Sequence, residues 1–360
     1  MTHASTGTLT ADTHRFRADE LAHFGARVLE SVGVPRADAT LVAESLITSD
    51  MWGHPSHGML RLPWYVARLQ SGVMNPNSVP EVISTFGAVT VLDGCDGVGQ
   101  VVTDSAVALA GEAAASHGIG AVAVRNSNHF GTAAYWTRTL ADQGCVGILT
   151  TNGSPAMAPW GGTDKMIGAN PWSIAVPGGS HGCVVLDIAN TGVARGKVYA
   201  AREKGIRLPE GWAIDANGLP TTDPQAAIDG LILPMAGHKG YAISFMMDIL
   251  SGVLTGSSYA TDVVGPFVPD RRSGCGHLVI ALAIEAIMPR ARFDQRIDDL
   301  IDTVKSSEAA PGAEILVPGE MENRAVASAG GTVQLPARTV AKLADLAASL
   351  GVTPPRADHR

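Results

Sequence analysis

The sequence predicts an α/β (α+β) protein in which a strand-rich middle lies between helical segments from both ends of the chain. Two observations predict this arrangement. Apolar residues recur at helical spacing towards both termini, whereas the middle holds short β-branched runs separated by Gly, Pro, Asn and Asp. At 360 residues the chain is long enough for two domains. We expect a helical domain at residues 1–75 with 286–360, and a strand-rich domain at residues 76–285.

The first 75 residues are predicted to be helical because apolar side chains return to one face of each segment. Gly33-Val34-Pro35 ends the first helix, and the second leads directly into Gly53-His54-Pro55-Ser56-His57. The first dozen residues have no such pattern and are expected to form a flexible tail. Helices are predicted over residues 18–32, 37–50 and 62–69.

The middle of the chain alternates between strand-like and helical segments, as α/β folds do. After the last predicted strand come a polar helix, a turn-rich segment around residues 317–320 and a terminal helix. Strands are predicted over residues 89–92, 121–124, 146–149, 173–176, 184–186 and 277–284. Helices are predicted over residues 103–116, 133–143, 240–254, 294–306 and 337–350.

The composition argues against several classes of function. The chain carries 26 basic and 34 acidic residues without a long basic cluster, so nucleic acid is not expected as a partner. No segment approaches the roughly 18 apolar residues of a membrane span, and the N-terminus lacks the apolar core of a signal peptide. The four cysteines lie far apart and form no Cys-x-x-Cys pair, which is typical of reduced thiols in a cytoplasmic protein.

A glycine-containing turn after the first predicted strand comes close to the dinucleotide fingerprint Gly-x-Gly-x-x-Gly. Gly97 and Gly99 fit this pattern, but the third glycine position is Val102. The acidic residue expected about 20 residues further on is replaced by Arg125 and Asn126. An ordinary Rossmann site is therefore not predicted, and the turn is interpreted as the start of a structural helix.

His57 is the first candidate catalytic residue. Histidine titrates near physiological pH, so it can give a proton to an alkoxide or take one from a hydroxyl group. Ser56 can hydrogen-bond the imidazole or a substrate oxygen, or it can simply cap a helix. Arg61 offers a fixed fork of donors that matches a carboxylate. These residue types together indicate an enzyme that acts on small carboxylates.

His129 is the second candidate. It follows a predicted strand and precedes a predicted helix, and α/β folds place ligands at such junctions. Gly131 permits the close approach of a ligand, and the polar residues before His129 can cap the helix. The remaining histidines, among them His277, have no comparable neighbours in the sequence.

Three further features are candidates for binding a ligand. The irregular but apolar segment at residues 151–171 is expected to line a site. Asp187 ends a predicted strand, where a carboxylate can bind ribose hydroxyls or cap the next helix. Lys239 begins a helix, which is unfavourable unless an anion lies nearby or its head extends into water. His54 and His57 have no further ligand at suitable spacing, so no metal is predicted.

Six motifs follow one another along the chain. They are Ser56-His-Gly-x-x-Arg61, Asn126-Ser-Asn-His-Phe-Gly131, Pro159-Trp-Gly-Gly162, Gly168-Ala-Asn-Pro171, Gly237-His-Lys-Gly240 and Val317-Pro-Gly-Glu320. In this order they resemble the malate/L-lactate dehydrogenase family, of the non-Rossmann, sulfolactate-dehydrogenase-like type. That type also includes ureidoglycolate dehydrogenase-like and diketogulonate/piperideine-carboxylate reductase-like enzymes. The resemblance extends over residues 18–352.

The resemblance implies a nicotinamide-binding domain with a mixed β-sheet and no Rossmann fold, and NAD or NADP as the cofactor. It implies that His57 acts as an acid or base supported by Ser56, with Arg61 on the substrate carboxylate. It places His129 at the nicotinamide, as a second candidate proton donor. Cofactor contacts are expected at His129, Gly131, Asp187, Ile188, Ala189, Lys239 and Glu320.

The implied reaction is hydride transfer between the cofactor and a small 2-hydroxy or 2-oxo acid such as malate or lactate. Similar proteins are homodimers with sites near the subunit interface, so we expect a homodimer. A cyclic imino acid is an alternative substrate for the same arginine clamp. A metal-free hydrolase or lyase built on Ser56 and His57 would need a nucleophile elbow, and the chain has none. The sequence leaves open which acid, which cofactor and which histidine are used.

Overall fold

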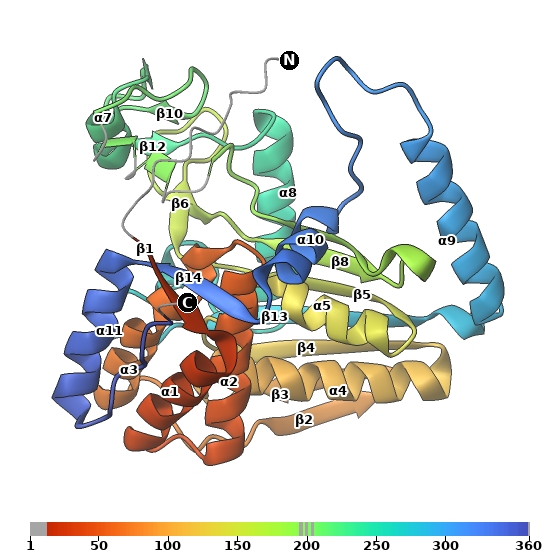
Figure 1. The fold of residues 1–360 in the computed structure, drawn as a ribbon, viewed down its shortest axis with the longest axis horizontal. Helices are drawn as coiled ribbons and strands as arrows, with labels where there is room; N and C mark the ends of the chain where they lie inside the picture. Colours follow the sequence, from red (N-terminus) through yellow and green to blue (C-terminus); the bar gives the residue numbers. More distant parts are fainter. Residues whose placement is uncertain (1–12, 194–196, 199–200, 203–204, 359–360) are drawn as a thin grey trace.

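The computed structural model describes residues 13–193, 197–198, 201–202 and 205–358. The tail predicted for the first dozen residues lies outside them. The described residues form a mixed α/β structure, in which a seven-stranded sheet lies beside helices from both ends of the chain (Figure 1). The predicted mixed α/β class is therefore correct.

The central sheet has the strand order β2-β3-β4-β13-β5-β8-β9. Within it β3 and β4 are parallel, and every other neighbouring pair is antiparallel. The parallel sheet of a Rossmann fold is thus replaced by a mixed one. The strands are β2 (Glu81–Phe86), β3 (Val89–Asp93), β4 (Ile119–Ser127), β5 (Cys145–Thr151), β8 (Trp172–Val176), β9 (Val184–Ile188) and β13 (Cys275–Ala283).

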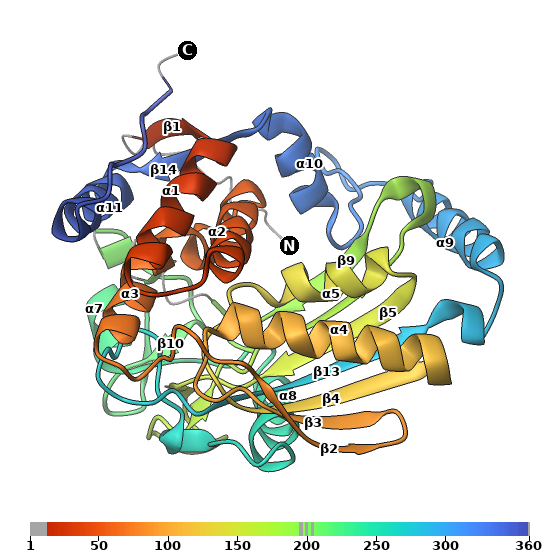
Figure 2. The ribbon, with the colours of Figure 1, turned by 90° about the horizontal axis from the view of Figure 1, so that it is seen from below.

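Helices cover both faces of this sheet (Figure 2). On one face lie α4 (Gly99–His117) and α5 (Ala133–Asp142). On the other lies α8 (His238–Asp248), which continues as a π-helical turn at Ile249–Val253. All of these helices were expected from the sequence. The helix predicted over 240–254 is helical as far as Val253 but changes its hydrogen-bond pattern near its end.

Small residues let α4 lie close to the sheet. A Cβ added to Gly120 of β4 would overlap the backbone carbonyl of Ala110 on α4. Large side chains of this core come from α5, whose Trp136 and Leu140 are fully buried. Trp136 also satisfies its polar atom, because its indole N–H donates to the carbonyl of Phe130 at 3.2 Å.

The two ends of the chain meet in a second hydrophobic cluster beside the sheet. A short antiparallel pair joins them, with Phe16 opposite Val333. Leu21, Leu46 and Leu343 are among its fully buried side chains. Its elements are β1 (Thr13–Arg17), α1 (Ala18–Ser31), α2 (Arg36–Met51), α3 (Leu62–Gln70), β14 (Thr332–Pro336) and α11 (Ala337–Leu350).

The segment between β13 and β14 lies elsewhere. Helix α9 (Arg290–Lys305) packs against the 3-10 turn at Gly179–His181, where Ser180 donates its backbone N–H to Asp298 at 2.9 Å. Helix α10 (Glu320–Ala329) begins where the sequence indicated only a turn. The domain division at 75/76 and 285/286 remains a proposal. This division assigns α9 to the helical domain, whereas α9 contacts the turn at Gly179–His181, which belongs to the strand-rich part.

A small unit lies between β9 and α8, and the sequence did not predict it. Its core includes Ala213, Ala227 and Ile232. Strands of two residues are too short to show a periodic pattern, which explains the omission. Its described elements are β10 (Ala213–Ile214), β11 (Pro220–Thr221), α7 (Pro224–Asp229) and β12 (Leu231–Ile232). A separate pair, β6 (Pro155–Met157) and β7 (Ile167–Gly168), lies within the irregular segment predicted at 151–171.

The contact between α4 and β4 gives a test of this fold. Gly120→Ala should lower the free energy of unfolding by roughly 1–3 kcal/mol, because the added methyl group overpacks against Ala110. Gly153→Ala is the matched control, since a Cβ at Gly153 meets nothing within 4 Å. It should change the free energy by less than about 0.5 kcal/mol. Equal losses in urea unfolding of the two variants would contradict the packing described.

Candidate active site

The fold brings the two predicted histidines together. His57 ends the 3-10 turn Pro55–His57 after α2, and His129 lies in the loop between β4 and α5. Their rings are nearly parallel, at 18°, with centroids 5.6 Å apart. Ser56, Arg61 and Gly131 lie with them, so five of the predicted site residues share one place in the fold.

The loop that carries His57 is fastened to the end of α2 by Asp50. The Asp50 carboxylate accepts the backbone N–H of Met59 at 2.8 Å. A Cβ at Gly58 would overlap that carboxylate, so only glycine fits there. Burial raises the pKa of Asp50 to about 7, partly offset by the Met59 hydrogen bond. Beyond this fastening, Ser56 Oγ lies 2.9 Å from His57 Nδ1.

Arg61 is arranged to bind an anion. Its Nε donates to the carbonyl of Ser56, and its guanidinium carbon lies 4.3 Å above the ring of Trp64. Phe267 in turn contacts Trp64 edge-on. Among the described residues, none accepts a hydrogen bond from the two terminal nitrogens of Arg61. The guanidinium is therefore held in place, and its two terminal nitrogens, whose geometry matches a carboxylate, have no acceptor among these residues.

Two residues that the sequence did not reveal, Tyr65 and Gln100, form a hydrogen-bonded row that ends at His129. The Tyr65 hydroxyl lies 2.7 Å from His129 Nδ1, and the Gln100 amide donates to the Tyr65 oxygen at 3.2 Å. The backbone N–H of Gly131 also donates to Nδ1, at 3.3 Å. Tyr65 follows Arg61 by four residues, so a helical reading could have placed both on one face. Gln100 had no such signal.

The glycine turn that imitates a dinucleotide fingerprint supports the His129 loop. Asn128 is fully buried, and its amide donates to the carbonyls of Asp96 and Gly97 at 3.0 and 2.8 Å. A Cβ at Gly99 would overlap the backbone carbonyls of Asn128 and His129. The glycines thus permit a protein loop, and not a pyrophosphate, to approach the start of α4.

Both histidines are held in their neutral form. Burial, then Arg61 and His54, lower the pKa of His57 to about 3. Burial, then Arg61, His57 and His277, hold the pKa of His129 well below its ordinary value. Two uncharged imidazoles beside a free guanidinium therefore form the site at neutral pH.

His277 lies beside this site, although the sequence gave it no neighbours. It is buried on β13, its ring packs edge-on against Phe130 at 4.7 Å, and its Nδ1 lies 2.8 Å from Thr151 Oγ1. Burial lowers its pKa to about 3. A neutral histidine behind Phe130 thus backs the loop that presents His129.

Asp187 bonds to the start of a helix, but this helix is the earlier α5, whereas the sequence suggested the next helix in the chain. It ends β9, and its carboxylate accepts the backbone N–H of Ala134 in the first turn of α5 at 2.8 Å. Burial raises its pKa to about 6. His54 and Glu322 lie near it, and His54 Nε2 is hydrogen-bonded to Glu322 Oε1 at 3.2 Å. Ile188 and Ala189 continue from Asp187 at the same edge of the sheet.

Lys239 and Glu320 do not contact the histidine pair. Lys239 is exposed in the first turn of α8. Glu320 begins α10 and is engaged within the chain, by Lys305 at 2.8 Å, by Arg324, and by the N–H of Val317 at 3.1 Å. The hydrogen bond from Lys305 is the largest cause that lowers the pKa of Glu320 to about 2. Their predicted cofactor contacts stay predictions.

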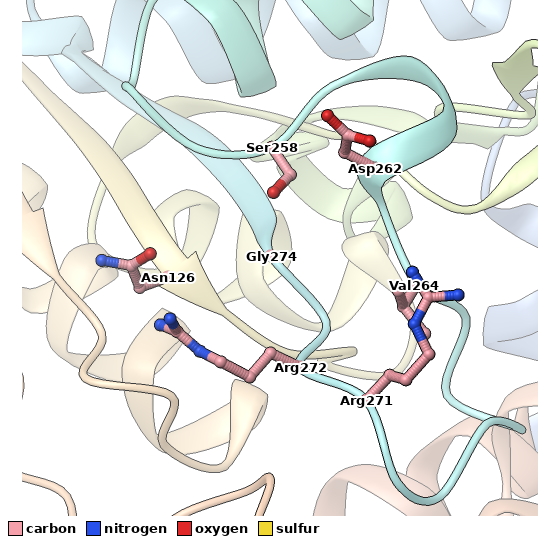
Figure 3. A pocket seen from close by; sticks show the side chains of 7 residues that line it. All are labelled: Asn126, Ser258, Asp262, Val264, Arg271, Arg272 and Gly274. Carbon is pink, nitrogen blue, oxygen red and sulfur yellow. The ribbon is translucent and has the colours of Figure 1, made fainter.

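A separate cavity of about 380 Å³ lies near the end of β4 (Figure 3). It shares the strand that leads to His129 but contains neither histidine. Arg272 extends towards Asn126 and pairs with Asp96 at 2.6 Å, while Arg271 extends the other way (Figure 3). The two guanidinium groups diverge, so they do not form one anion site. The lining residues are Asn126, Ser258, Asp262, Val264, Arg271, Arg272 and Gly274.

The described residues contain neither a candidate metal site nor a candidate membrane helix. Within the described ranges, no three His, Cys, Asp or Glu side chains are grouped so that they could hold a metal ion. Among the same residues, no helix is both long and apolar enough to cross a membrane.

Known proteins are similar to this chain over most of its length. The sequence profile described as malate/L-lactate dehydrogenase matches residues 16–344. The L-sulfolactate dehydrogenase of Methanocaldococcus jannaschii is 42% identical over 297 residues, which cover 82% of this chain and 86% of the relative. The malate dehydrogenase of Pyrococcus abyssi is 39% identical over 315 residues, which cover 85% and 86%. A (2R)-3-sulfolactate dehydrogenase (NADP(+)) of Chromohalobacter salexigens is 34% identical, covering 89% and 94%.

Solved structures have the same fold. The sulfolactate dehydrogenase of Methanocaldococcus jannaschii superposes with a TM-score of 0.90 at 38% identity, over 94% of this chain and 98% of that one. The Δ1-piperideine-2-carboxylate reductase of Pseudomonas syringae superposes with a TM-score of 0.83 at 27% identity, over 92% and 99%.

The fastening of the His57 loop predicts a dependence of stability on pH. Because the pKa of Asp50 is about 7 in the folded chain and 3.8 in the reference state, the folded chain binds the extra proton between those values. Asp50 should therefore make unfolding easier as pH rises from about 4 to about 7, by up to about 1.4 kcal/mol per pH unit. Asp50→Asn should remove this slope.

The control for this test is Asp345→Asn, which changes an exposed carboxylate on α11. Urea unfolding of both variants and the unchanged protein at a series of pH values measures the slopes. An Asp50→Asn slope equal to that of the unchanged protein would show that Asp50 does not take up the proton.

Proposed function

The chain belongs to the malate/L-lactate dehydrogenase family, and we propose that it transfers a hydride between NAD or NADP and a small 2-hydroxy acid or its 2-oxo acid. It is an oxidoreductase of the 2-hydroxyacid dehydrogenase class. The observation that carries the proposal is the free Arg61 guanidinium beside the stacked His57 and His129 rings. Three groups of this kind meet the needs of a 2-oxo acid, which presents a carboxylate next to a carbonyl.

Arg61 binds the substrate carboxylate. A two-pronged contact fixes the position of the acid and leaves its α-carbon and oxygen near the two imidazoles. The stacking on Trp64 and the bond to the Ser56 carbonyl hold the guanidinium in this orientation. The binding energy of the carboxylate is thereby used to place the reacting atoms.

The imidazoles act on the oxygen of the substrate. In the oxidation direction one of them takes the hydroxyl proton, and a neutral ring is required for that step. Burial and the charge of Arg61 keep both rings neutral in the free protein. When the carboxylate pairs with Arg61, its negative charge favours the imidazolium form, so substrate binding prepares the proton transfer.

The residues around His129 fit a nicotinamide cofactor, which supplies or accepts the hydride when bound. Gln100 Oε1 is buried without a partner among the described groups, so it requires a donor such as a carboxamide N–H. Gly131 leaves open space beside His129, because a Cβ there would meet one atom only, at 4.0 Å. We propose that the cofactor also contacts Asp187, Ile188, Ala189, Lys239 and Glu320.

The proposal includes candidates for the cofactor, NAD or NADP, and for the acid. NADP is supported by the relative named for its use of NADP. Malate, lactate and sulfolactate are candidates because the matching family and the similar proteins are named as dehydrogenases of these acids. A cyclic imino acid is the second candidate, favoured by the likeness to a piperideine-carboxylate reductase.

The test is the absorbance of NADH and NADPH over time with a panel of 2-oxo acids and cyclic imino acids. Oxidation of one cofactor with one 2-oxo acid would support the first candidate, and oxidation with imino acids alone would replace it by the second. Silence across the panel, with no binding of either cofactor by fluorescence, would contradict the dehydrogenase proposal.

Arg61→Gln should raise KM for the acid roughly 10- to 100-fold, since it removes charge-assisted hydrogen bonds. It should leave the Kd of NADH or NADPH unchanged, which is the control. Because the charge of Arg61 lowers the pKa of His57, the acid limb of kcat/KM for oxidation should also move to higher pH. An unchanged KM would exclude Arg61 as the clamp.

We further propose that the protein is a homodimer. Large apolar side chains on α8, at the end of its π-helical turn and just after it are exposed in the single chain, which supports an oligomer: Phe245, Met246, Val253 and Leu254. Gel filtration with light scattering should give twice 37.2 kDa. A mass of 37.2 kDa at micromolar concentration would contradict it.

A further inference from the structure

The hydrogen bonds around His129 determine where its proton lies. A backbone N–H can only donate, and the N–H of Gly131 points at His129 Nδ1. Nδ1 must therefore be unprotonated, because two N–H groups cannot face one another across a hydrogen bond. A neutral imidazole with a bare Nδ1 carries its proton on Nε2.

Tyr65 and Gln100 complete the same arrangement. With Nδ1 bare, the Tyr65 hydroxyl must donate to it across 2.7 Å. The Tyr65 oxygen then accepts from the Gln100 amide N–H at 3.2 Å. All bonds in the row Gln100, Tyr65, His129 point in one direction. Reversing them would put a proton on Nδ1 opposite the Gly131 N–H.

The row is sheltered from water. Tyr65 and Gln100 are both fully buried. Burial raises the pKa of Tyr65 to about 12, so its hydroxyl keeps its proton. Gln100 lies in the first turn of α4, which is packed against the His129 loop through Gly99. The two side chains that set the direction of these bonds are therefore out of contact with solvent.

His57 lacks such a constraint. The group at its Nδ1 is the hydroxyl of Ser56, which can donate or accept. His57 can therefore carry its proton on either nitrogen or on both. Among the described groups, none bonds to the Nε2 of either ring.

We propose that Tyr65 and Gln100 are positioning residues that hold His129 as its neutral Nε2–H form, so that His129 donates a hydrogen bond to the reacting oxygen while His57 exchanges the proton with it. The inference rests on the dehydrogenase function proposed above. During reduction the carbonyl carbon receives the hydride, the π electron pair moves to the oxygen, and that oxygen takes the proton of the His57 imidazolium. His57 ends neutral, and His129 keeps its proton throughout.

The first experiment measures the tautomer directly. ¹⁵N NMR of the full chain with ¹⁵N-labelled histidine distinguishes protonated from bare ring nitrogens, and loss of signals in His129→Gln assigns them. At about pH 6 to 8, on both sides of neutrality, we expect a bare Nδ1 and a protonated Nε2. A protonated Nδ1 would overturn the inference, whether or not the protein is a dehydrogenase.

Variants then test the two positioning residues. Tyr65→Phe and Gln100→Met should weaken the preference for the Nε2–H form in the NMR spectrum and lower kcat roughly 10- to 100-fold with little change in KM. Thr103→Val is the matched control, because it removes another buried polar group of α4 that bonds only within its helix. Thr103→Val should change neither. Unchanged spectra for Tyr65→Phe and Gln100→Met would overturn the positioning role.

The pH profile of oxidation separates the two histidines. The groups that face them are Arg61, His54, Tyr65 and His277. His57→Gln should lower kcat by about 10²–10⁴ and abolish the acid limb of kcat/KM. His129→Gln should lower kcat but retain that limb. Loss of the limb in His129→Gln alone would reverse the assignment, and absence of cofactor binding in the unchanged protein would instead contradict the proposed function.

Discussion

The candidate active site depends on the hydrogen-bonded amide of the buried Asn128 side chain. This amide joins the α3 helix, through Arg68 at 3.1 Å, to the turn at Asp96 and Gly97. Arg68 is itself fully buried and also donates to the carbonyl of Val268. Because every polar atom of the Asn128 side chain is satisfied, the loop has one stable position. His129 follows directly, so its place is fixed by the hydrogen bonds of its neighbour.

This support explains why α3 is central to the site. Arg61 directly precedes the helix, Tyr65 lies one turn into it and Arg68 follows, so three contacts of the site come from this short helix and its N-cap. The helix also belongs to the hydrophobic cluster formed by both ends of the chain, through Leu62, Tyr65 and Val66. Burial of Arg68 is costly unless its hydrogen bonds are made. The packing of the chain ends and the geometry of the site are therefore maintained together.

Much of the fold could be predicted from periodic patterns, and the omissions have physical causes. Strand β2 was missed because all six of its residues are exposed, so it lacks the alternation of a half-buried strand. In the site, residue type and spacing indicated His57 and Arg61. Tyr65 was not indicated, because it lies among apolar residues and its partner is 64 positions away in the sequence. Hydrogen bonds of this range follow from the topology, which local patterns do not contain.

The near-match to a dinucleotide fingerprint is a second case in which a local pattern does not contain the topology. Gly97 and Gly99 stand after a strand and before a helix, as the pattern requires, and they do allow a close approach. What approaches Gly97 is the side chain of Ser78. What approaches Gly99 is the backbone of Asn128 and His129, because β4 runs parallel to β3 and delivers its loop to that turn. A glycine pattern therefore indicates where backbone comes near, and the sheet order decides what comes near it. Here the sheet order assigns the space at the start of α4 to the loop that carries His129, while the space beside Gly131 stays open.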